Sequence, residues 1–414
     1  MANTFNFGNG KWATKKDRIL GFNNQNANFK PLAFSNTRAS IATVVNKTGL
    51  VETIVNGMPR VDYLSSTNGG YLVEPQSTNV FNYSEAFSNS YWVKSGTSVE
   101  DGFSAPSVDS PLGASKLVES TANSNHFLAR SAAFISGSFN TASFFVKANG
   151  RSSISIRSGN SAVWSASALF NISTGVVTST VNGTAKIEDY GNGYYKCSIT
   201  GEAFSTASTS AVVYLDNDGL SYTGDGISGI FIFGAQLEQK ASSTSYISTS
   251  GSAQTRLAET ANQSFQNDVI NSAEGVFYVE LKALADDLTD RRIGLSNGST
   301  GNSVRIGYGS VSNRITAVVY NGSNQAVLTH TSPDITKFSK IAVKYKVNDF
   351  ALWVDGVERS TDTSGTTFSA NTLSQVNFNN GGGGVANTAM FGVVKDMKIY
   401  TTILTDSQLA TLTK

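Results

Sequence analysis

The stretch FSKIAVKYKVNDFALWVDGVE at residues 338–358 constrains the fold more than any other part of the chain. Its first half alternates between the apolar set Ile341, Val343, Tyr345 and Val347 and the intervening set Ala342, Lys344 and Lys346. A period of two is typical of a half-buried strand. Asn348-Asp349 and Asp355-Gly356 each interrupt the alternation, and Asp-Gly is a strong hairpin signal because glycine tolerates a positive φ. The stretch therefore predicts a meander of antiparallel strands with one core face and one solvent face.

This meander resembles the centre of a laminin-G-like, concanavalin A-type jelly roll, as found in C-terminal modules of bacteriophage tail-fibre and other virion surface proteins. The flanking segments that carry the resemblance are GVFYVELK (275–282), DRRIGLSNG (290–298) and VVKDMKIYTTILT (393–405). The resemblance covers about residues 262–414 and implies a short helix at 405–412. It indicates a fold and not a function, because this fold serves lectins, enzymes and spacers alike.

The length and charge of the chain narrow the classes of protein that it can form. A chain of 414 residues allows two to four domains. Lys and Arg number 31 against 30 Asp and Glu, which argues against a nucleic-acid partner, since such partners usually select a basic stripe. No apolar run approaches the roughly 18 residues of a membrane span, so we expect no membrane insertion. The low charged fraction of 15% and the abundance of Gly, Ser, Thr and Asn favour short strands joined by turns.

The single cysteine and the amino-terminal segment bear on where the protein is made. Cys197 is alone, so no intrachain disulfide and no cysteine-based zinc site can form. The first 20 residues lack the apolar segment of a signal peptide. We therefore expect a protein that is made in the cytoplasm and delivered by assembly, as a virion component would be.

Residues 1–75 are predicted to form a small, irregular N-terminal region. Their short segments are punctuated by Asn-Gly pairs, and they resemble a leader that precedes a β-sandwich in many phage structural proteins. Their apolar residues are too scattered for a core of their own: Phe5, Phe7, Trp12, Ile19, Leu20 and Phe22. We expect this region to serve virion docking and oligomerisation. Arg38 and Arg60 lie at recurrent positions of the leader, where they form either structural ion pairs or a docking contact.

Residues 76–254 are predicted to form one β-sandwich, because short strands and turn signals alternate regularly along them. Four segments resemble the carbohydrate-binding-module-like domain of phage tail proteins: NYSEAFSNSYWVK (82–94), IEDYGNGYYKCSIT (187–200), SYTGDGISGIFIFGAQLEQ (221–239) and TSYIST (244–249). A Ser/Thr-rich linker at 240–262 places the boundary of the jelly roll near 255, so the jelly roll covers 255–414. The glycines at 381–384 predict a loop. The predicted fold class is all-β, with tandem antiparallel sandwich and jelly-roll domains.

The chain offers few residues for catalysis, so we predict that it is not an enzyme. His126 and His330 are the only histidines and lie in different predicted domains, and no G-x-S-x-G elbow is present. Retaining glucanases of this fold need two carboxyl groups about 5 Å apart, and Glu280 stands alone on its strand. The acidic residues of the loop at 286–290 adjoin Arg291 and Arg292 and predict an ion-paired rim: Asp286, Asp287 and Asp290.

Two small sets of residues are candidates for binding. One loop gathers oxygen ligands of the kind that Ca²⁺ prefers, and these residues form either a calcium site or an ordinary Asx-turn loop: Asp216, Asn217, Asp218 and Asp225. Apart from this calcium, we expect no cofactor. The candidates for glycan contact are Trp164, which lies between small polar residues, and Tyr320 with Asn321. Trp92 and Trp353 lie in strand patterns and are predicted to be core residues.

Together these features predict a non-catalytic phage virion protein, a tail fibre or spike that adheres to host-surface glycans. Two alternatives stay open: a purely structural decoration or head-fibre protein without glycan binding, and a polysaccharide depolymerase. The expected location is the virion surface, in the tail or a capsid appendage. The expected partners are host-cell glycans, other virion proteins and two further copies of the chain in a homotrimer.

Overall fold

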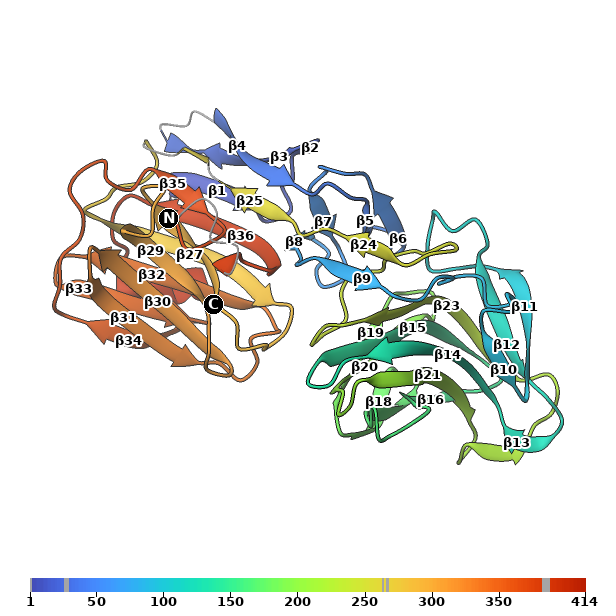
Figure 1. Cartoon of the computed structure of the whole chain (residues 1–414). Coiled ribbons are helices and arrows are strands. Elements are labelled where there is room, and N and C mark those ends of the chain that lie inside the picture. The colour runs from blue at the N-terminus through green and yellow to red at the C-terminus, as the bar shows by residue number, and fades with distance from the viewer. Residues whose placement is uncertain (1, 26–29, 263, 266–267, 382–387) are drawn as a thin grey trace. The chain divides into compact units, whose positions relative to one another are not determined.

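The computed structural model describes residues 2–25, 30–262, 264–265, 268–381 and 388–414, and their regular structure is nearly all β (Figure 1). The predicted fold class is confirmed: antiparallel sheets form sandwich and jelly-roll architectures. One short helix, α1 (Asp406–Thr413), occurs in the described part of the chain. No helix there has the length and apolar character needed to cross a membrane.

The chain forms two compact units, each assembled from separate stretches of sequence. The jelly-roll unit comprises Met1–Ala39, Val55–Pro75 and Ala258–Lys414. The sandwich unit comprises Ser40–Ile54 and Gln76–Leu257. The expected boundary near 255 thus falls close to Leu257, where the chain returns to the jelly-roll unit. Gly382–Gly384, from the expected glycine loop, lie outside the described residues.

The jelly-roll unit contains a twelve-stranded and a six-stranded antiparallel sheet. The main path of the larger sheet runs β25 (Thr260–Asn262), β4 (Lys30–Thr37), β3 (Arg18–Asn23), β1 (Phe5–Gly8), β36 (Gly392–Tyr400), β27 (Glu274–Ala283), β32 (Ser339–Lys346), β33 (Asp349–Val354) and β34 (Val357–Asp362). Three short strands pair beside this path: β2 (Thr14–Lys15), β7 (Arg60–Asp62) and β8 (Gly70–Val73). The smaller sheet runs β26 (Ser264–Phe265), β35 (Gln375–Asn377), β28 (Arg291–Ser296), β29 (Asn302–Tyr308), β30 (Arg314–Asn321) and β31 (Asn324–Thr331).

A continuous core lies between these two sheets. Phe277, Val343 and Leu352 enter it from the larger sheet, and Ile293 and Ile306 enter it from the smaller one. All five side chains are fully buried. Burial of this apolar surface is the main favourable contribution to the stability of the unit.

The expected separate region at 1–75 does not form a unit of its own, which corrects the sequence-based prediction. β1 pairs with β36 at the other end of the chain, with Phe5 opposite Ile399. Phe5, Phe7 and Ile19 are completely buried in the jelly-roll core. These side chains looked too scattered for a core because their partners are supplied by the last strand. They are therefore not available for contacts between subunits.

The predicted meander is present as β32, β33 and β34. Val354 pairs with Val357, so Asp355-Gly356 is a two-residue turn, and both residues have positive φ, 49° and 82°. The first turn differs by one residue from the prediction. Lys346 pairs with Asp349, which leaves Val347-Asn348 as the turn.

The expected solvent face of this meander is instead partly covered by α1. Ala342, Ala351 and Trp353 form a second core with Leu409 of the helix. Trp353 is 7% exposed, so its predicted core position is confirmed. Alternation along a strand shows that two faces differ, but it cannot show that a distant segment will cover one of them. The helix begins with a capping box, in which the side chains of Thr405 and Gln408 each accept a backbone N–H of the other residue.

The helix contact gives a direct test of this second core. Leu409→Ala should lower the free energy of unfolding of the jelly-roll unit by about 2–5 kcal/mol, because a fully buried leucine leaves a cavity. Urea unfolding of the full chain measures the change. Ser407→Ala, on an exposed position of the same helix, should leave stability nearly unchanged and serves as the control. Equal losses in the two variants would contradict the packing role of α1.

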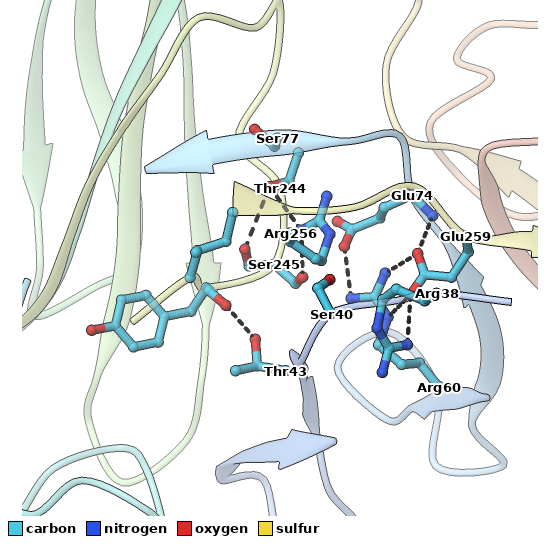
Figure 2. A network of polar contacts seen from close by, with 12 residues as sticks. Arg38, Ser40, Thr43, Arg60, Glu74, Ser77, Thr244, Ser245, Arg256 and Glu259 are labelled. Carbon is cyan, nitrogen blue, oxygen red and sulfur yellow. Dashed lines mark hydrogen bonds and ion pairs between the residues drawn. The ribbon is translucent and has the colours of Figure 1, made fainter. Parts of the chain in front are cut away.

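A buried ionic cluster lies where segments of the jelly-roll unit meet, and we call it the Glu259 cluster: Arg38, Arg60, Glu74 and Glu259 (Figure 2). Arg60 Nε donates to Glu259 Oε1 at 2.6 Å, and Arg38 Nη1 donates to the same oxygen at 2.9 Å. Arg60 Nη1 lies 2.7 Å from Glu74 Oε2. Two positive and two negative charges thus balance in an environment buried from solvent.

The structural alternative for Arg38 and Arg60 is confirmed, and a docking contact is excluded because both side chains are fully buried. Burial by itself would lower the pKa of Arg60, but Glu259 and Glu74 outweigh it and raise this pKa. Arg60 therefore stays charged and matched by carboxylates.

The Glu259 cluster should be essential to the stability of the jelly-roll unit. Glu259→Gln should lower its free energy of unfolding by about 3–5 kcal/mol, because two buried guanidinium groups lose their shared carboxylate. Thermal unfolding of the full chain measures this loss. Glu358→Gln, on an exposed position of β34, removes one charge of the same sign and should have little effect. A stable Glu259→Gln variant would show that the cluster does not hold the unit together.

The sandwich unit consists of two six-stranded antiparallel sheets and three short two-stranded sheets. One large sheet runs β10 (Val93–Ser95), β14 (Phe127–Phe134), β21 (Ala207–Asp216), β16 (Ser153–Ser158), β17 (Ser167–Asn171) and β18 (Val176–Val181). The other runs β11 (Thr97–Phe103), β12 (Ala114–Glu119), β23 (Gly229–Glu238), β15 (Phe139–Asn149), β20 (Tyr195–Glu202) and β19 (Thr184–Asp189). The pairs are β5 (Ala42–Val45) with β6 (Val51–Ile54), β9 (Ser77–Asn79) with β24 (Gln254–Arg256), and β13 (Asn123–Asn125) with β22 (Ser221–Thr223).

Both large sheets of the sandwich unit contribute to one core. Ile154 and Val213 enter it from one sheet, and Phe144 and Ile232 enter it from the other. Trp92 packs into this core at 2% exposure, so its predicted core position is also confirmed.

Candidate functional site

The six-stranded sheet of the jelly-roll unit carries several polar side chains on the face that points away from the core. Alternation directs Ile293, Leu295, Val304 and Ile306 into the core, and the residues between them lie on the opposite face. We call this opposite face the polar sheet face. Its half-buried polar residues are Arg292, Arg305, Thr316 and Tyr320, whereas Ser296, Ser303, Gln375 and Asn377 are buried. Strand register fixes which of these residues are neighbours.

Two arginines on this face are each paired with a glycine on the neighbouring strand. The tripeptide Arg-Ile-Gly occurs at 292–294 and again at 305–307. Because β28 and β29 are antiparallel, Arg292 lies opposite Gly307, and Arg305 lies opposite Gly294. A Cβ at 294 would lie 2.8 Å from Arg305 Cα, and a Cβ at 307 would lie 2.9 Å from Arg292 Cδ. Glycine thus leaves the space in which each arginine stem lies.

The two guanidinium groups have different partners. Arg292 Nη2 donates to Asp290 Oδ1 at 2.8 Å. Arg305 Nη1 donates to Asn380 Oδ1 at 2.5 Å, and Arg305 Cζ lies 5.5 Å from the centroid of the Tyr320 ring. Burial lowers the pKa of both arginines, and the proximity of Arg292 lowers that of Arg305 further. Two like charges are therefore held close together on a partly desolvated surface.

Of the predicted glycan contacts in this unit, the structure places one on the polar sheet face. Tyr320 is half-buried there, opposite Ser303. Asn321 is directed elsewhere, because its Nδ2 donates to the carbonyl oxygen of Thr367 at 2.7 Å. Asn321 thus fixes a loop and is not part of this face.

Trp164 belongs to the sandwich core, which corrects the expectation that it offers a ring to a sugar. Its side chain is fully buried and stacks on Phe134, with 5.4 Å between the ring centroids. Its Nε1 donates to the carbonyl oxygen of Gly201 at 3.1 Å. The small residues around it in the sequence suggested exposure, but small neighbours also allow close packing around a large ring.

The expected calcium loop is organised by its own hydrogen bonds. The Asp225 carboxylate accepts the backbone N–H groups of Ile227 and Ser228 at 2.8 and 2.6 Å and the Ser228 hydroxyl at 2.7 Å. These bonds lower the pKa of Asp225. In the described part of the chain, no three or more His, Cys, Asp or Glu side chains are arranged to hold a metal ion. Asn217 and Asp218 are exposed, and Asp216 is half-buried at the end of β21.

The two histidines lie in different units, His126 in the sandwich unit and His330 in the jelly-roll unit. His126 is fully buried, with Nδ1 2.6 Å from the carbonyl oxygen of Gly96 and Nε2 3.1 Å from that of Tyr222. His330 is half-buried in β31, where burial and Arg359 lower its pKa.

Glu280 is not isolated, contrary to the prediction from its strand. Asp396 of β36 lies opposite it, and this neighbour could not be recognised because it comes from the far end of the chain. Lys395 Nζ lies 2.6 Å from Glu280 Oε1, and Lys398 pairs with Asp396. Burial raises the pKa of Asp396. Each carboxylate is thus bound by its own lysine.

The predicted ion-paired rim is confirmed for two of its three acidic residues. Asp287 pairs with Arg291 at 3.2 Å and Asp290 pairs with Arg292 at 2.8 Å. Asp286 instead accepts the backbone N–H of Asn313 at 3.0 Å.

The sandwich unit has a groove of about 290 Å³ beside the β5–β6 hairpin. Its lining is mostly hydroxyl and amide side chains with a buried tyrosine and arginine, and includes Thr43, Thr53, Tyr246, Ser248, Gln254 and Arg256. Arg256 Nη1 donates to the hydroxyls of Thr244 and Ser245, as Figure 2 shows. The groove has hydrogen-bonding groups but no half-exposed aromatic ring of the kind found on the polar sheet face.

Residues 243–410 match the family model of the concanavalin A-like lectin/glucanases superfamily, which covers most of the third segment of the jelly-roll unit. No curated protein matches the chain.

Three solved structures illustrate the similarity. The CBM40 domain of a Ruminococcus gnavus IT-sialidase is 15% identical, with a TM-score of 0.30 over 34% of this chain and 84% of that one. A putative carbohydrate-binding protein from Bacteroides ovatus is 11% identical, with a TM-score of 0.29 over 69% and 79% of the two chains. Domains LG4-5 of mouse laminin α1 are 10% identical, with a TM-score of 0.25 over 68% and 88%.

The glycines opposite the arginines are open to test. Gly294→Ala should lower the free energy of unfolding of the jelly-roll unit by about 1–3 kcal/mol, because the new methyl group would lie 2.3 Å from the carbonyl oxygen of Val304. Denaturant unfolding measures the change. Gly301→Ala is the matched control, since its Cβ would meet nothing closer than 3.4 Å. Full stability of the Gly294→Ala variant would show that the strands adapt without cost.

Proposed function

We propose that the chain is a non-catalytic glycan-binding protein and that the polar sheet face of the jelly-roll unit contacts the sugar. One observation carries this proposal: the half-buried Tyr320 ring lies beside the half-buried Arg305 guanidinium group, and buried hydroxyl and amide side chains adjoin them on the same face. An aromatic ring covers the apolar face of a sugar, and the surrounding polar groups bind its hydroxyls. The match of residues 243–410 to a superfamily that includes lectins supports the same function.

The proposal of a non-catalytic role is supported by the state of the carboxylates. A retaining hydrolase needs one carboxylate free to act as a nucleophile and a second as an acid. Glu280 and Asp396 are instead each neutralised by a lysine, at 2.6 Å in the case of Glu280. This arrangement favours a structural role for both carboxylates over a depolymerase activity.

The finer proposal places this adhesion on the surface of a bacteriophage particle, in a tail fibre, spike or capsid appendage. It is supported by the resemblance of residues 1–75 and 82–249 to segments of phage structural and tail proteins. Assembly as a homotrimer belongs to the same proposal and would multiply weak single-site contacts. Because Phe5, Phe7 and Ile19 are core residues, a trimer contact would have to use other side chains.

Glycan binding is tested with a microarray of bacterial surface glycans and the full-length protein. Tyr320→Ala should weaken binding about tenfold, which corresponds to about 1.4 kcal/mol and is typical of a lost aromatic contact. Phe204→Ala removes a ring that is 58% exposed in the sandwich unit, and it should bind like the original chain. Absence of binding to every glycan would favour the structural decoration protein. Shortened polysaccharide after incubation would favour the depolymerase.

A further inference from the structure

The charges on the polar sheet face are not balanced, and this imbalance indicates the kind of sugar that it binds. Of the two arginines on this face, Arg292 is paired with Asp290, and the charge of Asp290 also acts on Arg305. Arg305 forms no ion pair with any carboxylate of the described residues, and its one hydrogen bond there is to Asn380. The residues outside the described part of the chain include no Asp or Glu, so they cannot supply the missing charge.

Polar atoms without partners are concentrated at the same place. Arg305 Nε and Arg292 Nη1 are buried and make no hydrogen bond to any residue that the structure describes, and the same is true of Ser303 Oγ and Gln375 Oε1. Register places Ser296 opposite both Ser303 and Gln375, so these two residues flank one position of β28. Native proteins leave few buried polar groups unpaired, and a cluster of them needs an explanation such as a bound ligand or water.

We propose that the polar sheet face binds an acidic glycan, whose carboxylate is held by the guanidinium groups of Arg305 and Arg292. This inference rests on the proposed glycan-binding function and names its ligand class. A carboxylate would supply the charge that Arg305 lacks and would relieve the repulsion between the two arginines. The planar guanidinium matches the two oxygens of a carboxylate and forms stronger hydrogen bonds with it than with a neutral hydroxyl.

The surroundings of Arg305 hold it in position for such a contact. Its stem lies across Gly294, its Nη1 is bound to Asn380, and its Cζ lies 5.5 Å from the centroid of the Tyr320 ring. These contacts use one terminal nitrogen and one face of the guanidinium. Tyr320 is also the ring that the proposed function assigns to the sugar. An acidic sugar that packs beside this ring would therefore bring its carboxylate toward Arg305.

The experiment compares acidic polysaccharides with their neutral counterparts. Polygalacturonate, alginate and polysialate are tested for binding to the full-length protein, each beside the same polymer after chemical reduction of its carboxyl groups. At least one acidic polymer should bind, and carboxyl reduction should weaken that binding about tenfold or more, the amount expected for loss of a charge-assisted hydrogen bond. Binding should also weaken as ionic strength rises.

Variants assign the effect to Arg305. Arg305→Ala and the better space-filling Arg305→Gln should both lose the preference for the acidic polymer, whereas Arg305→Lys, which keeps the charge but not the fork, should retain part of it. Arg359→Ala is the matched control, because Arg359 is exposed on β34 of the same unit. Unfolding curves that match the original chain verify that each variant folds.

The outcomes separate this inference from the proposed function. Equal binding to acidic and reduced polymers, or binding to neutral glycans alone, would overturn the carboxylate site and leave glycan binding in place. A preference for acidic polymers that survives both Arg305→Ala and Arg305→Gln would also overturn it. Absence of binding to acidic and neutral glycans alike would overturn both proposals.

Discussion

Separate segments of the jelly-roll unit are joined at one buried carboxylate, that of Glu259. The chain leaves this unit after Ala39 and Pro75 and returns at Val55 and Ala258. All four crossings adjoin the Glu259 cluster: Arg38 binds Glu259 and the carbonyl oxygen of Val55, while the backbone N–H of Glu74 donates to Glu259 Oε2 at 3.0 Å. Apolar packing is not directional, so a charged network with fixed geometry is better suited to hold separate segments in register. Its desolvation cost is tolerable only because every charge has a partner.

The sequence predicted those parts of the fold that depend on neighbouring residues. The alternation at 338–358 and its Asp-Gly turn determine the β32–β33–β34 meander, because both signals act within a few residues. The same reasoning missed the pairing of β1 with β36 and the covering of the meander by α1. These contacts join distant parts of the chain, and no local pattern specifies which strand becomes the neighbour of another. Phe5, Phe7 and Ile19 were therefore assigned to a subunit contact, although they are core residues.

The candidate site was predictable only in part, for a related reason. Tyr320 was identified from its place next to a turn, and it does lie on the polar sheet face, whereas Trp164 was chosen on similar grounds and is buried. Exposure of an aromatic residue depends on what packs above it, which composition does not show. Arg291 and Arg292 were assigned to an ion-paired rim, and Arg305 was not singled out. Yet the repeated Arg-Ile-Gly tripeptide carried a usable signal. When two such tripeptides lie on antiparallel strands, the arginine of each strand can lie over the glycine of the other.

The position of these arginines on a packed sheet bears on how well they can bind. A flexible arginine on a loop loses rotamer freedom when it captures a ligand, and this loss of about 1–2 kcal/mol opposes binding. On the polar sheet face the stem of Arg305 is already confined by Gly294, Asn380 and Tyr320. Most of the rotamer freedom of Arg305 is therefore already lost on folding and need not be lost on binding. The core between the two sheets also keeps the strands that carry the arginines at a fixed spacing. The apolar face of β28 and β29 would thus contribute to the proposed recognition through the opposite face of the same strands.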